Sequence, residues 1–238
     1  MKLRERSSPN FDARPGAGVV DMLILHYTGM KTATDALDRL CYPAAKVSAH
    51  YLIDEDGTVW RLVEESKRAW HAGISSWRGR SDINAASIGI ELVNPGHEFG
   101  YRAFPEPQMV ALDELARDVL GRLPIPPRHV LGHSDVAPQR KQDPGELFDW
   151  ARLAQSGIGL WPDFTAAAAE ASDDVGALQT ALATIGYACP ISGQLDAETR
   201  AVVAAFQRHY RPARCDGAAD AETHRRAAIL AQALGATI

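Results

Sequence analysis

The chain has 238 residues, of which 46% are hydrophobic and 23% are charged, proportions typical of a globular protein with room for one large domain or two smaller ones. Its formal net charge of −5 at pH 7 lacks the positive surface that binding to a phosphate backbone requires, so nucleic acid is excluded as the expected partner. No stretch approaches the roughly 18 consecutive apolar residues that would span a bilayer. The opening segment MKLRERSSPNFDARPG also lacks the apolar centre of a secretory signal, and we therefore expect a cytoplasmic protein with no membrane span.

The three cysteines are Cys41, Cys189 and Cys215. They are odd in number and widely spaced, and no C-x-x-C pair is present, so the sequence predicts neither a disulfide framework nor a thiolate zinc cluster. Buried free thiols are the expected state, and a bridge between Cys189 and Cys215 is the alternative.

The first part of the chain carries strand and helix patterns in alternation. VVDMLILHYT at 19–28 is rich in aliphatic and β-branched residues and predicts a buried strand that ends near His26. Segment 34–40 predicts a helix capped by Thr34. The runs on either side of EDG at 55–57 predict a β-hairpin, because the Asp-Gly pair supplies the positive φ of a tight turn.

A further apolar strand is predicted over 87–93, and a short one over 128–134. Between them, apolar residues recur at helical spacing over 106–122, where prolines flank both ends and indicate an amphipathic helix. The resulting order β-α-β-β-β-α-β predicts an α/β domain, with a mixed central β-sheet flanked by helices, over 1–162.

The composition changes after this domain. The low-complexity run TAAAAEASDD predicts a linker over 163–173. Helical spacing then predicts a small all-α three-helix domain over 174–238. The predicted helices cover 174–187, 196–210 and 220–234. The last two begin with DAET, in which the aspartate caps free N–H groups and the glutamate lies favourably in the first turn.

Two histidines and an aspartate have the composition of a catalytic zinc site. Such sites use three protein ligands, often two neutral imidazoles and one carboxylate, and leave the fourth position for water. His26 ends one predicted strand and His133 follows another, so neighbouring strands would bring them together. Asp143 precedes a Pro-Gly turn that can fold the loop back towards them. The alternative is that both histidines are hydrogen-bonded core residues and Asp143 a turn residue.

Glu91 is an anomaly in the apolar strand SIGIELV. Burial of an unpaired carboxylate costs several kcal/mol, so its position indicates function; the alternative is a glutamate that faces solvent or pairs with an arginine. Lys141 lies two residues before Asp143, and alternate residues of an extended segment point to the same side. We therefore expect Lys141 to reach the same site, while Arg140 points away as a surface charge.

Several motifs occur together in one order: ILHYTG, VSAHYLIDEDG, AWHAG, SIGIELVN and GHSDVAPQRKQDPG. Over about residues 7–162 they resemble the zinc-dependent N-acetylmuramoyl-L-alanine amidases of the AmpD and AmiD type. That family is related in fold to peptidoglycan recognition proteins and phage amidase lysozymes, and it binds zinc through two histidines and an aspartate or cysteine. The resemblance implies Zn²⁺ as cofactor, with His26, His133 and Asp143 as its ligands.

The resemblance also implies roles for Glu91 and Lys141. Amide hydrolysis needs a base that takes a proton from water and passes it to the departing amine, and the family's catalytic glutamate matches Glu91. The lysine of K-x-D-P-G in similar enzymes stabilises the developing oxyanion and matches Lys141.

Three further residues are predicted to contact substrate. Trp70 and His71 in AWHAG pair an indole with a polar ring, which suits contact with a sugar or stem peptide; a tryptophan packed in a loop is the alternative. Asn84 is the third predicted contact. His50 also matches the family, but it starts a strand and we interpret it as structural, whereas His97, His129, His209 and His224 have no companion motif and are interpreted as surface or packing residues.

The C-terminal segment resembles a three-helix peptidoglycan-binding domain, through LQTALATIGY, SGQLDAETRAVVAAFQRHY and CDGAADAETHRRAAIL. One departure is Ser192-Gly193, where Asp-Gly is common. The resemblance implies that this domain holds the enzyme on polymeric wall, which raises the local substrate concentration. A degenerate helical appendage that only packs on the catalytic domain is the alternative.

Together these features predict hydrolysis of the amide between N-acetylmuramic acid and L-alanine, in peptidoglycan or in soluble muropeptides. The alternative from another class is a non-catalytic recognition protein on the same fold, although such binders usually lack a zinc ligand. The absence of a signal favours a cytoplasmic recycling enzyme, whereas the wall-binding segment favours intact sacculus and a location in the periplasm or cell envelope.

Overall fold

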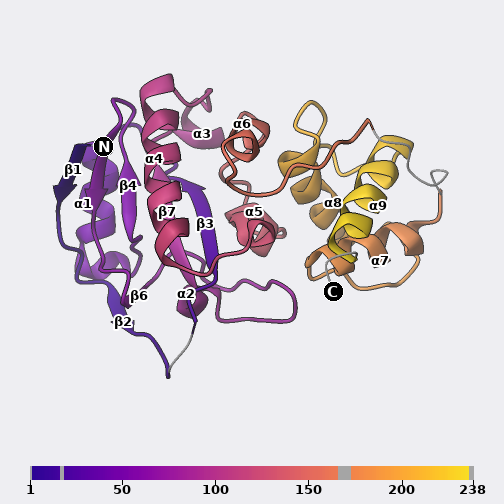
Figure 1. Ribbon diagram of the computed structural model, residues 1–238, viewed down its shortest axis with the longest axis horizontal. Helices are drawn as coiled ribbons and strands as arrows, with labels where there is room; N and C mark the ends of the chain where they lie inside the picture. The colour runs from indigo at the N-terminus through magenta and orange to yellow at the C-terminus, as the bar shows by residue number, and fades with distance from the viewer. Residues whose placement is uncertain (1, 17–18, 166–172, 236–238) are drawn as a thin grey trace.

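A computed structural model describes residues 2–16, 19–165 and 173–235, and its centre is a six-stranded mixed sheet (Figure 1). All neighbouring strands are parallel except β4 and β5. In spatial order the strands are β1 (Lys2–Glu5), β5 (Thr58–Arg61), β4 (Tyr51–Ile53), β7 (Ser87–Leu92), β3 (Met22–Tyr27) and β8 (Val130–Gly132). The predicted mixed sheet is confirmed.

The strand β3 lies between β7 and β8, and all its residues except the last are buried. Side chains alternate between the faces of a strand. Leu23 and Leu25 therefore face α4 (Glu106–Arg122), while Met22 and Ile24 face the opposite side together with His26. The predicted amphipathic helix over 106–122 is thus confirmed as the cover of one face.

On the opposite face of the sheet, α1 (Ala33–Cys41) packs against β4. An apolar cluster also extends from Met22 and Ile24 of β3, by way of α5, to the C-terminal helices, which lie beyond α5 in Figure 1. The predicted cap of α1 at Thr34 is wrong. The helix begins one residue earlier, at Ala33, and the Thr32 hydroxyl accepts the hydrogen bond from the Asp35 N–H at 3.1 Å.

The predicted hairpin is confirmed as β4 and β5, which pair antiparallel. Gly57 has a φ of 81° and its N–H donates to the Asp54 carbonyl at 2.9 Å. Two elements of the N-terminal segment were not predicted. The strand β1 extends the sheet beside β5, and β2 (Phe11–Ala13) pairs with β6 (Lys67–Ala69).

Short helical turns join the main elements. They are α2 (Ile83–Ala86), α3 (Gly96–Phe99), α5 (His133–Val136), α6 (Trp150–Gln155) and the 3-10 turns η1 (Pro43–Ala45) and η2 (Pro127–His129). The turn α2 leads into β7, which carries Glu91, and α5 follows β8 and begins at His133.

The C-terminal part forms the three predicted helices, α7 (Val175–Ile185), α8 (Ala197–Tyr210) and α9 (Ala221–Gly235). The predicted aspartate caps are present: Asp196 accepts from the Thr199 N–H and Asp220 from the Thr223 N–H. Most of the predicted linker, 163–173, lies outside the described residues. Cys41, Cys189 and Cys215 are free thiols.

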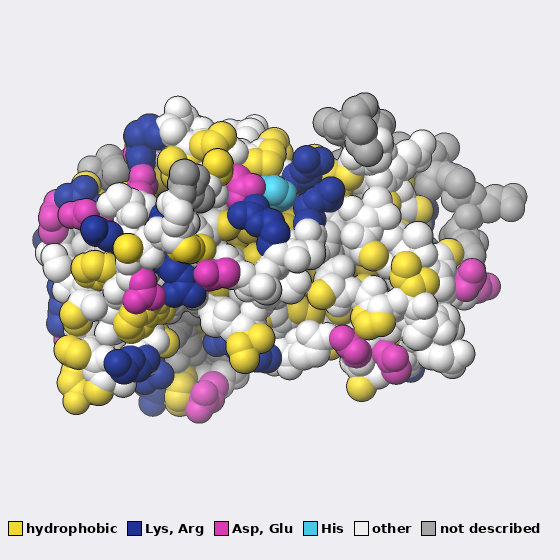
Figure 2. Space-filling model, turned by 90° about the horizontal axis from the view of Figure 1, so that it is seen from below, with side chains coloured by type: hydrophobic (Ala, Val, Ile, Leu, Met, Phe, Trp, Pro, Cys, Tyr) yellow, Lys and Arg dark blue, Asp and Glu magenta, His cyan; other side chains and the backbone are white. Residues whose placement is uncertain are grey.

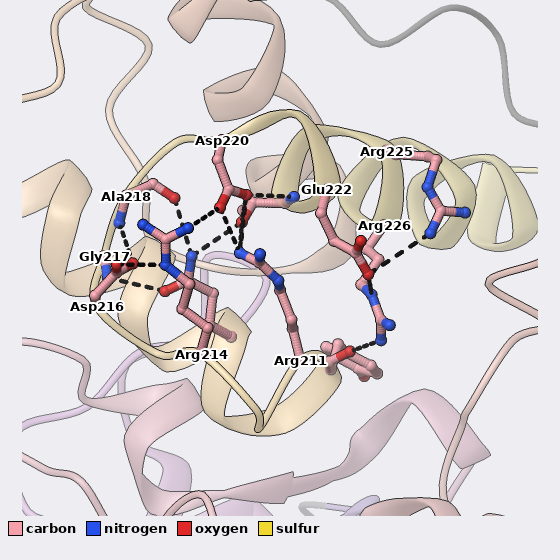
Figure 3. A network of polar contacts seen from close by, with 12 residues as sticks. Arg211, Arg214, Asp216, Gly217, Ala218, Asp220, Glu222, Arg225 and Arg226 are labelled. Carbon is pink, nitrogen blue, oxygen red and sulfur yellow. Dashed lines mark hydrogen bonds and ion pairs between the residues drawn. The ribbon is translucent and has the colours of Figure 1, made fainter.

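An ionic network fixes the connection between α8 and α9 (Figure 3). Asp220 accepts from the guanidinium groups of Arg211 and Arg214 at 2.8 to 3.1 Å, and Asp216 accepts from Arg214 and from the Ala218 N–H. Single exposed ion pairs add little stability, but shared partners reduce the entropy lost per contact. The network therefore orders the start of α9.

Candidate active site

The predicted ligand set is brought together at one end of the sheet. His26 lies in β3, His133 opens α5 directly after the neighbouring β8, and Asp143 lies on the loop beyond. The His26 and His133 Nδ1 atoms are 3.0 Å apart, and Asp143 Oδ2 lies 3.1 and 3.0 Å from them. All three side chains are buried, and together they form a group able to hold a metal ion.

The donor chemistry of this triad suits zinc. Burial, and then the neighbouring His133, lower the pKa of His26 to about 4, so its imidazole is neutral at pH 7. Burial on its own raises the pKa of Asp143, but contacts with His133 and His26 outweigh it and hold this pKa below its usual range. Zinc bonds of about 2.0 to 2.2 Å in a tetrahedron separate the donors by about 3.3 to 3.6 Å, so the observed spacing of 3.0 to 3.1 Å needs only a small expansion to hold the ion.

Hydrogen bonds behind the triad orient both imidazoles. His133 Nε2 donates to the Ala72 carbonyl at 3.1 Å, and His26 Nε2 lies 3.0 Å from His71 Nδ1. His71 Nε2 in turn lies 3.2 Å from Ser87 Oγ, which donates to the Ile83 carbonyl. When His26 and His133 carry their protons on Nε2, every donor in this series of hydrogen bonds has an acceptor, and the Nδ1 atom of each histidine is left to bind a cation. Hydrogen bonds of this kind orient the histidines of known metal sites.

Glu91 lies directly opposite His26 in the pairing of β7 with β3. Its Oε2 atom is buried and has no hydrogen-bond partner in the part of the chain that the structure describes. Burial and then Asp143 raise the pKa of Glu91 well above its usual value, and Lys141 opposes them. No described arginine pairs with this glutamate, and a buried carboxylate of this kind is expected at functional sites.

A cavity of about 430 Å³ opens at His133 and Asp143 of the triad, whereas His26 is not among the residues that line it. Its walls include Trp70, His71, Glu91, His133, Lys141 and Asp143, so the structure gathers most of the predicted site residues around one space. Figure 2 shows Lys and Arg side chains, with a histidine beside them, at the junction of the sheet-containing part and the C-terminal helices. A base, a cation and a metal triad around one cavity suit hydrolysis of an unactivated carbonyl compound.

Asn84 is not among the residues that line this cavity, and its substrate contact stays a prediction. It is buried in α2, and its Oδ1 accepts from the N–H groups of His71 and Ala72 at 3.1 and 2.8 Å. The amide thus fixes the loop that carries His71, because its acceptor oxygen is fully used.

We expect Asn84→Leu to lower the free energy of unfolding. The change leaves the buried N–H groups of His71 and Ala72 without an acceptor, and each such group lowers the free energy of unfolding by about 1–3 kcal/mol. Urea denaturation followed by circular dichroism measures the loss. Asn84→Asp retains the acceptor and serves as the control, and equal losses in both variants would contradict this role.

Three other predicted residues lie at or near the cavity. Trp70 lines it and donates from Nε1 to Asp12 Oδ2 at 2.7 Å. Arg140 is exposed, as predicted, but the prediction that it points away from the site is wrong, because it lines the cavity and its guanidinium donates to the carbonyls of Ala72 and Ile74. His50 is fully buried and accepts from the Gly89 N–H at 2.9 Å, which supports the structural interpretation.

Two contacts at the cavity have no counterpart in any sequence pattern. His97, interpreted as a surface or packing residue, lines the cavity; its ring stacks on Tyr101 with centroids 4.3 Å apart and its Nδ1 lies 2.9 Å from the Tyr27 hydroxyl. Gly89 leaves space for His71, because a Cβ at Gly89 would lie 2.5 to 2.6 Å from that ring.

Comparison with known proteins identifies the family. The family model for N-acetylmuramoyl-L-alanine amidases matches residues 16–146 of the sequence. A second family model, for a putative peptidoglycan binding domain, matches residues 171–226. AmiD of Escherichia coli is 39% identical over an alignment 241 positions long, which covers 91% of this chain and 84% of AmiD. AmpD of Haemophilus influenzae is 33% identical over 171 residues, which cover 64% of this chain and 91% of AmpD.

Solved structures agree with this result. A complex of Escherichia coli AmiD with the substrate anhydro-N-acetylmuramic acid-L-Ala-D-γ-Glu-L-Lys has a TM-score of 0.80 and 38% identity, covering 93% of this chain and 92% of that one. AmpDh3 from Pseudomonas aeruginosa has a TM-score of 0.78 and 33% identity, covering 96% and 95%. The chain with the triad of His26, His133 and Asp143 thus belongs to the N-acetylmuramoyl-L-alanine amidase family of enzymes.

Proposed function

We propose that the protein uses zinc to hydrolyse the amide between the lactyl group of N-acetylmuramic acid and the L-alanine of the stem peptide. His26, His133 and Asp143 hold the ion. Glu91 Oε2 lies opposite His26 of this triad and has no hydrogen-bond partner among the described residues. It carries the proposal, because a non-catalytic recognition protein has no use for an unpaired base at this position. The related AmiD binds an anhydro-muramyl tripeptide as its substrate, and we propose peptidoglycan or a muropeptide for this chain.

Zinc, when bound, polarises the scissile carbonyl and acidifies the attacking water. Glu91 takes a proton from that water at a carboxylate oxygen and delivers it to the nitrogen of the departing alanine. Lys141 lines the same cavity and places its ammonium group near the oxygen on which negative charge develops. His71 keeps the proton on His26 Nε2, so we assign it a positioning role beside its place on the cavity wall.

The cavity also suits the acidic stem peptide. Arg39 and Lys141 line it, and among the described residues neither has an ion-pair partner. Stem peptides carry free carboxylates, with which a guanidinium forms paired hydrogen bonds. We propose Trp70 as the contact for the sugar or the first peptide residues.

We expect Lys141→Met to lower kcat about 10²- to 10³-fold with little change in KM, because the lost donor acts on transition-state charge. Steady-state turnover of anhydro-muropeptide measures both parameters. Lys141→Arg retains the positive charge and should recover part of the rate. A KM increase with unchanged kcat would make Lys141 a binding residue instead.

Digestion of purified sacculi and of soluble anhydro-muropeptide tests the function, with products identified by mass. We expect free stem peptide from both substrates, loss of turnover with a chelator and recovery with Zn²⁺. Binding without cleavage would favour the recognition protein, and chelator-resistant turnover would refute zinc dependence.

The C-terminal helices are proposed to hold the enzyme on polymeric wall, as the match to the peptidoglycan binding domain supports. Among the described residues no helix has the length and apolarity needed to cross a membrane. A cytoplasmic location fits soluble muropeptide as substrate, and a periplasmic or envelope location fits intact sacculus. The ratio of the two turnover rates discriminates between them.

A further inference from the structure

Asp135 connects the metal-site segment to the C-terminal helices. It lies in α5, two residues after His133, and its side chain is fully buried. Oδ2 accepts from the Gly132 N–H at 2.7 Å and from His209 Nδ1 at 2.7 Å, while Oδ1 accepts from the Tyr187 hydroxyl at 2.6 Å. Two of its three donors thus come from the helical part of the chain.

Both of these donors are held by aromatic packing across the same junction. The His209 ring stacks on Trp150 of α6, with centroids 3.7 Å apart and planes 17° apart, and on Tyr210 from the other side. Tyr187 packs edge-on against Trp77 at 5.0 Å. His209 and Tyr187 are both buried, so neither can easily turn away from the carboxylate.

The backbone N–H that Asp135 bonds, that of Gly132, lies beside the segments that carry two of the proposed metal ligands. Gly132 precedes His133 and packs so closely on Pro144, the residue after Asp143, that a Cβ at Gly132 would lie 2.8 Å from the proline ring. The Ser134 N–H donates to the Asp143 carbonyl at 2.9 Å. A shift of the carboxylate therefore moves both ligand backbones.

We propose that Tyr187 and His209 are positioning residues for the zinc site, acting through Asp135. A buried carboxylate is costly unless its oxygens are bonded, and these two donors fix it where it holds the Gly132 N–H and hence His133. The helical part is accordingly a structural component of the metal centre as well as a wall-binding element. This inference rests on the proposed zinc-dependent function.

The test is the zinc affinity of the full chain with single donors removed. Tyr187→Phe removes one hydroxyl and His209→Phe removes the donor nitrogen while keeping a stacking ring. Competition with a chromophoric chelator gives the zinc dissociation constant, and the visible spectrum of Co²⁺-loaded protein reports ligand geometry. We expect zinc binding about tenfold weaker in each variant, at the low end of the range for residues outside the ligand shell, with an altered Co²⁺ spectrum.

Thr199→Val is the matched control. It also removes a buried hydroxyl from the helical part, where Thr199 bonds Gln179, but it does not touch Asp135. We expect the zinc affinity and Co²⁺ spectrum of this variant to equal those of the unaltered protein, whatever its thermal midpoint.

The results distinguish failure of the positioning role from failure of the proposed function. Unchanged zinc affinity in Tyr187→Phe would overturn the positioning role even if its thermal midpoint falls, because simple docking accounts for that fall. This variant loses a single oxygen atom, so it decides the question even if His209→Phe does not fold. Failure of the unaltered protein to bind zinc would instead refute the proposed function.

Discussion

Glu91→Gln should lower kcat by about 10²- to 10⁴-fold, the range that a positioned general base contributes, while zinc stays bound. The amide has nearly the same shape as the carboxylate but cannot take a proton from water. The structure supports this separation of effects, because Glu91 Oε2 has no bond to any described residue and the triad is held by other contacts. Turnover of anhydro-muropeptide and metal content by mass spectrometry measure the two quantities.

Glu198→Gln provides the control for this change. Glu198 is an exposed carboxylate in the first turn of α8 and does not line the cavity, and its conversion removes the same charge from the protein, so kcat on soluble substrate should stay near that of the unaltered enzyme. A Glu91→Gln enzyme that keeps its metal and its full rate would assign the base elsewhere.

Asp143→Ala should abolish zinc binding at micromolar metal and lower turnover about 10³-fold or more, because several kcal/mol of transition-state stabilisation depend on the ion. The carboxylate is the one anionic member of the triad and touches both imidazoles. Its loss leaves two neutral donors, too few for a catalytic zinc site. Chelator competition and turnover with excess Zn²⁺ measure the effect.

Asp143→Cys tests whether ligation or the carboxylate itself matters. A thiolate also binds zinc, so this variant should retain the metal and a measurable part of the rate. Metal retention by Asp143→Ala would contradict the ligand assignment, since the triad would then not require its third member.

Strong periodicity explains which elements were predictable. The strand β3 and the helix α4 carry long apolar patterns and were predicted almost to their ends. The strands β1 and β2 are exposed along their whole length, so no apolar pattern in the sequence indicates them. They are strands because partners lie beside them, and this depends on tertiary structure.

The candidate site also combines residues that local pattern predicts with residues whose roles depend on tertiary contacts. His26, His133 and Asp143 were predictable because a metal limits the residue types and the sheet order brings strand ends together. The contact of Asn84 with the loop that carries His71 was not predictable, because nothing in a short helix indicates which side chain turns inward to bond a neighbouring loop. The contacts of Asp135 were also beyond prediction: it accepts from the nearby Gly132 N–H, but its two other donors come from residues far along the chain.

The apolar cluster that covers the triad-bearing face of the sheet has a practical consequence. It runs without a break from Met22 and Trp77 of the sheet-containing part to Leu182 and Phe206 of the helices. Replacement of the C-terminal helices by another wall-binding domain would therefore expose apolar side chains to water and remove two of the three hydrogen-bond donors of Asp135. A chimaera of this amidase should therefore keep the sheet-containing part and the C-terminal helices together, or else redesign the apolar contacts between them.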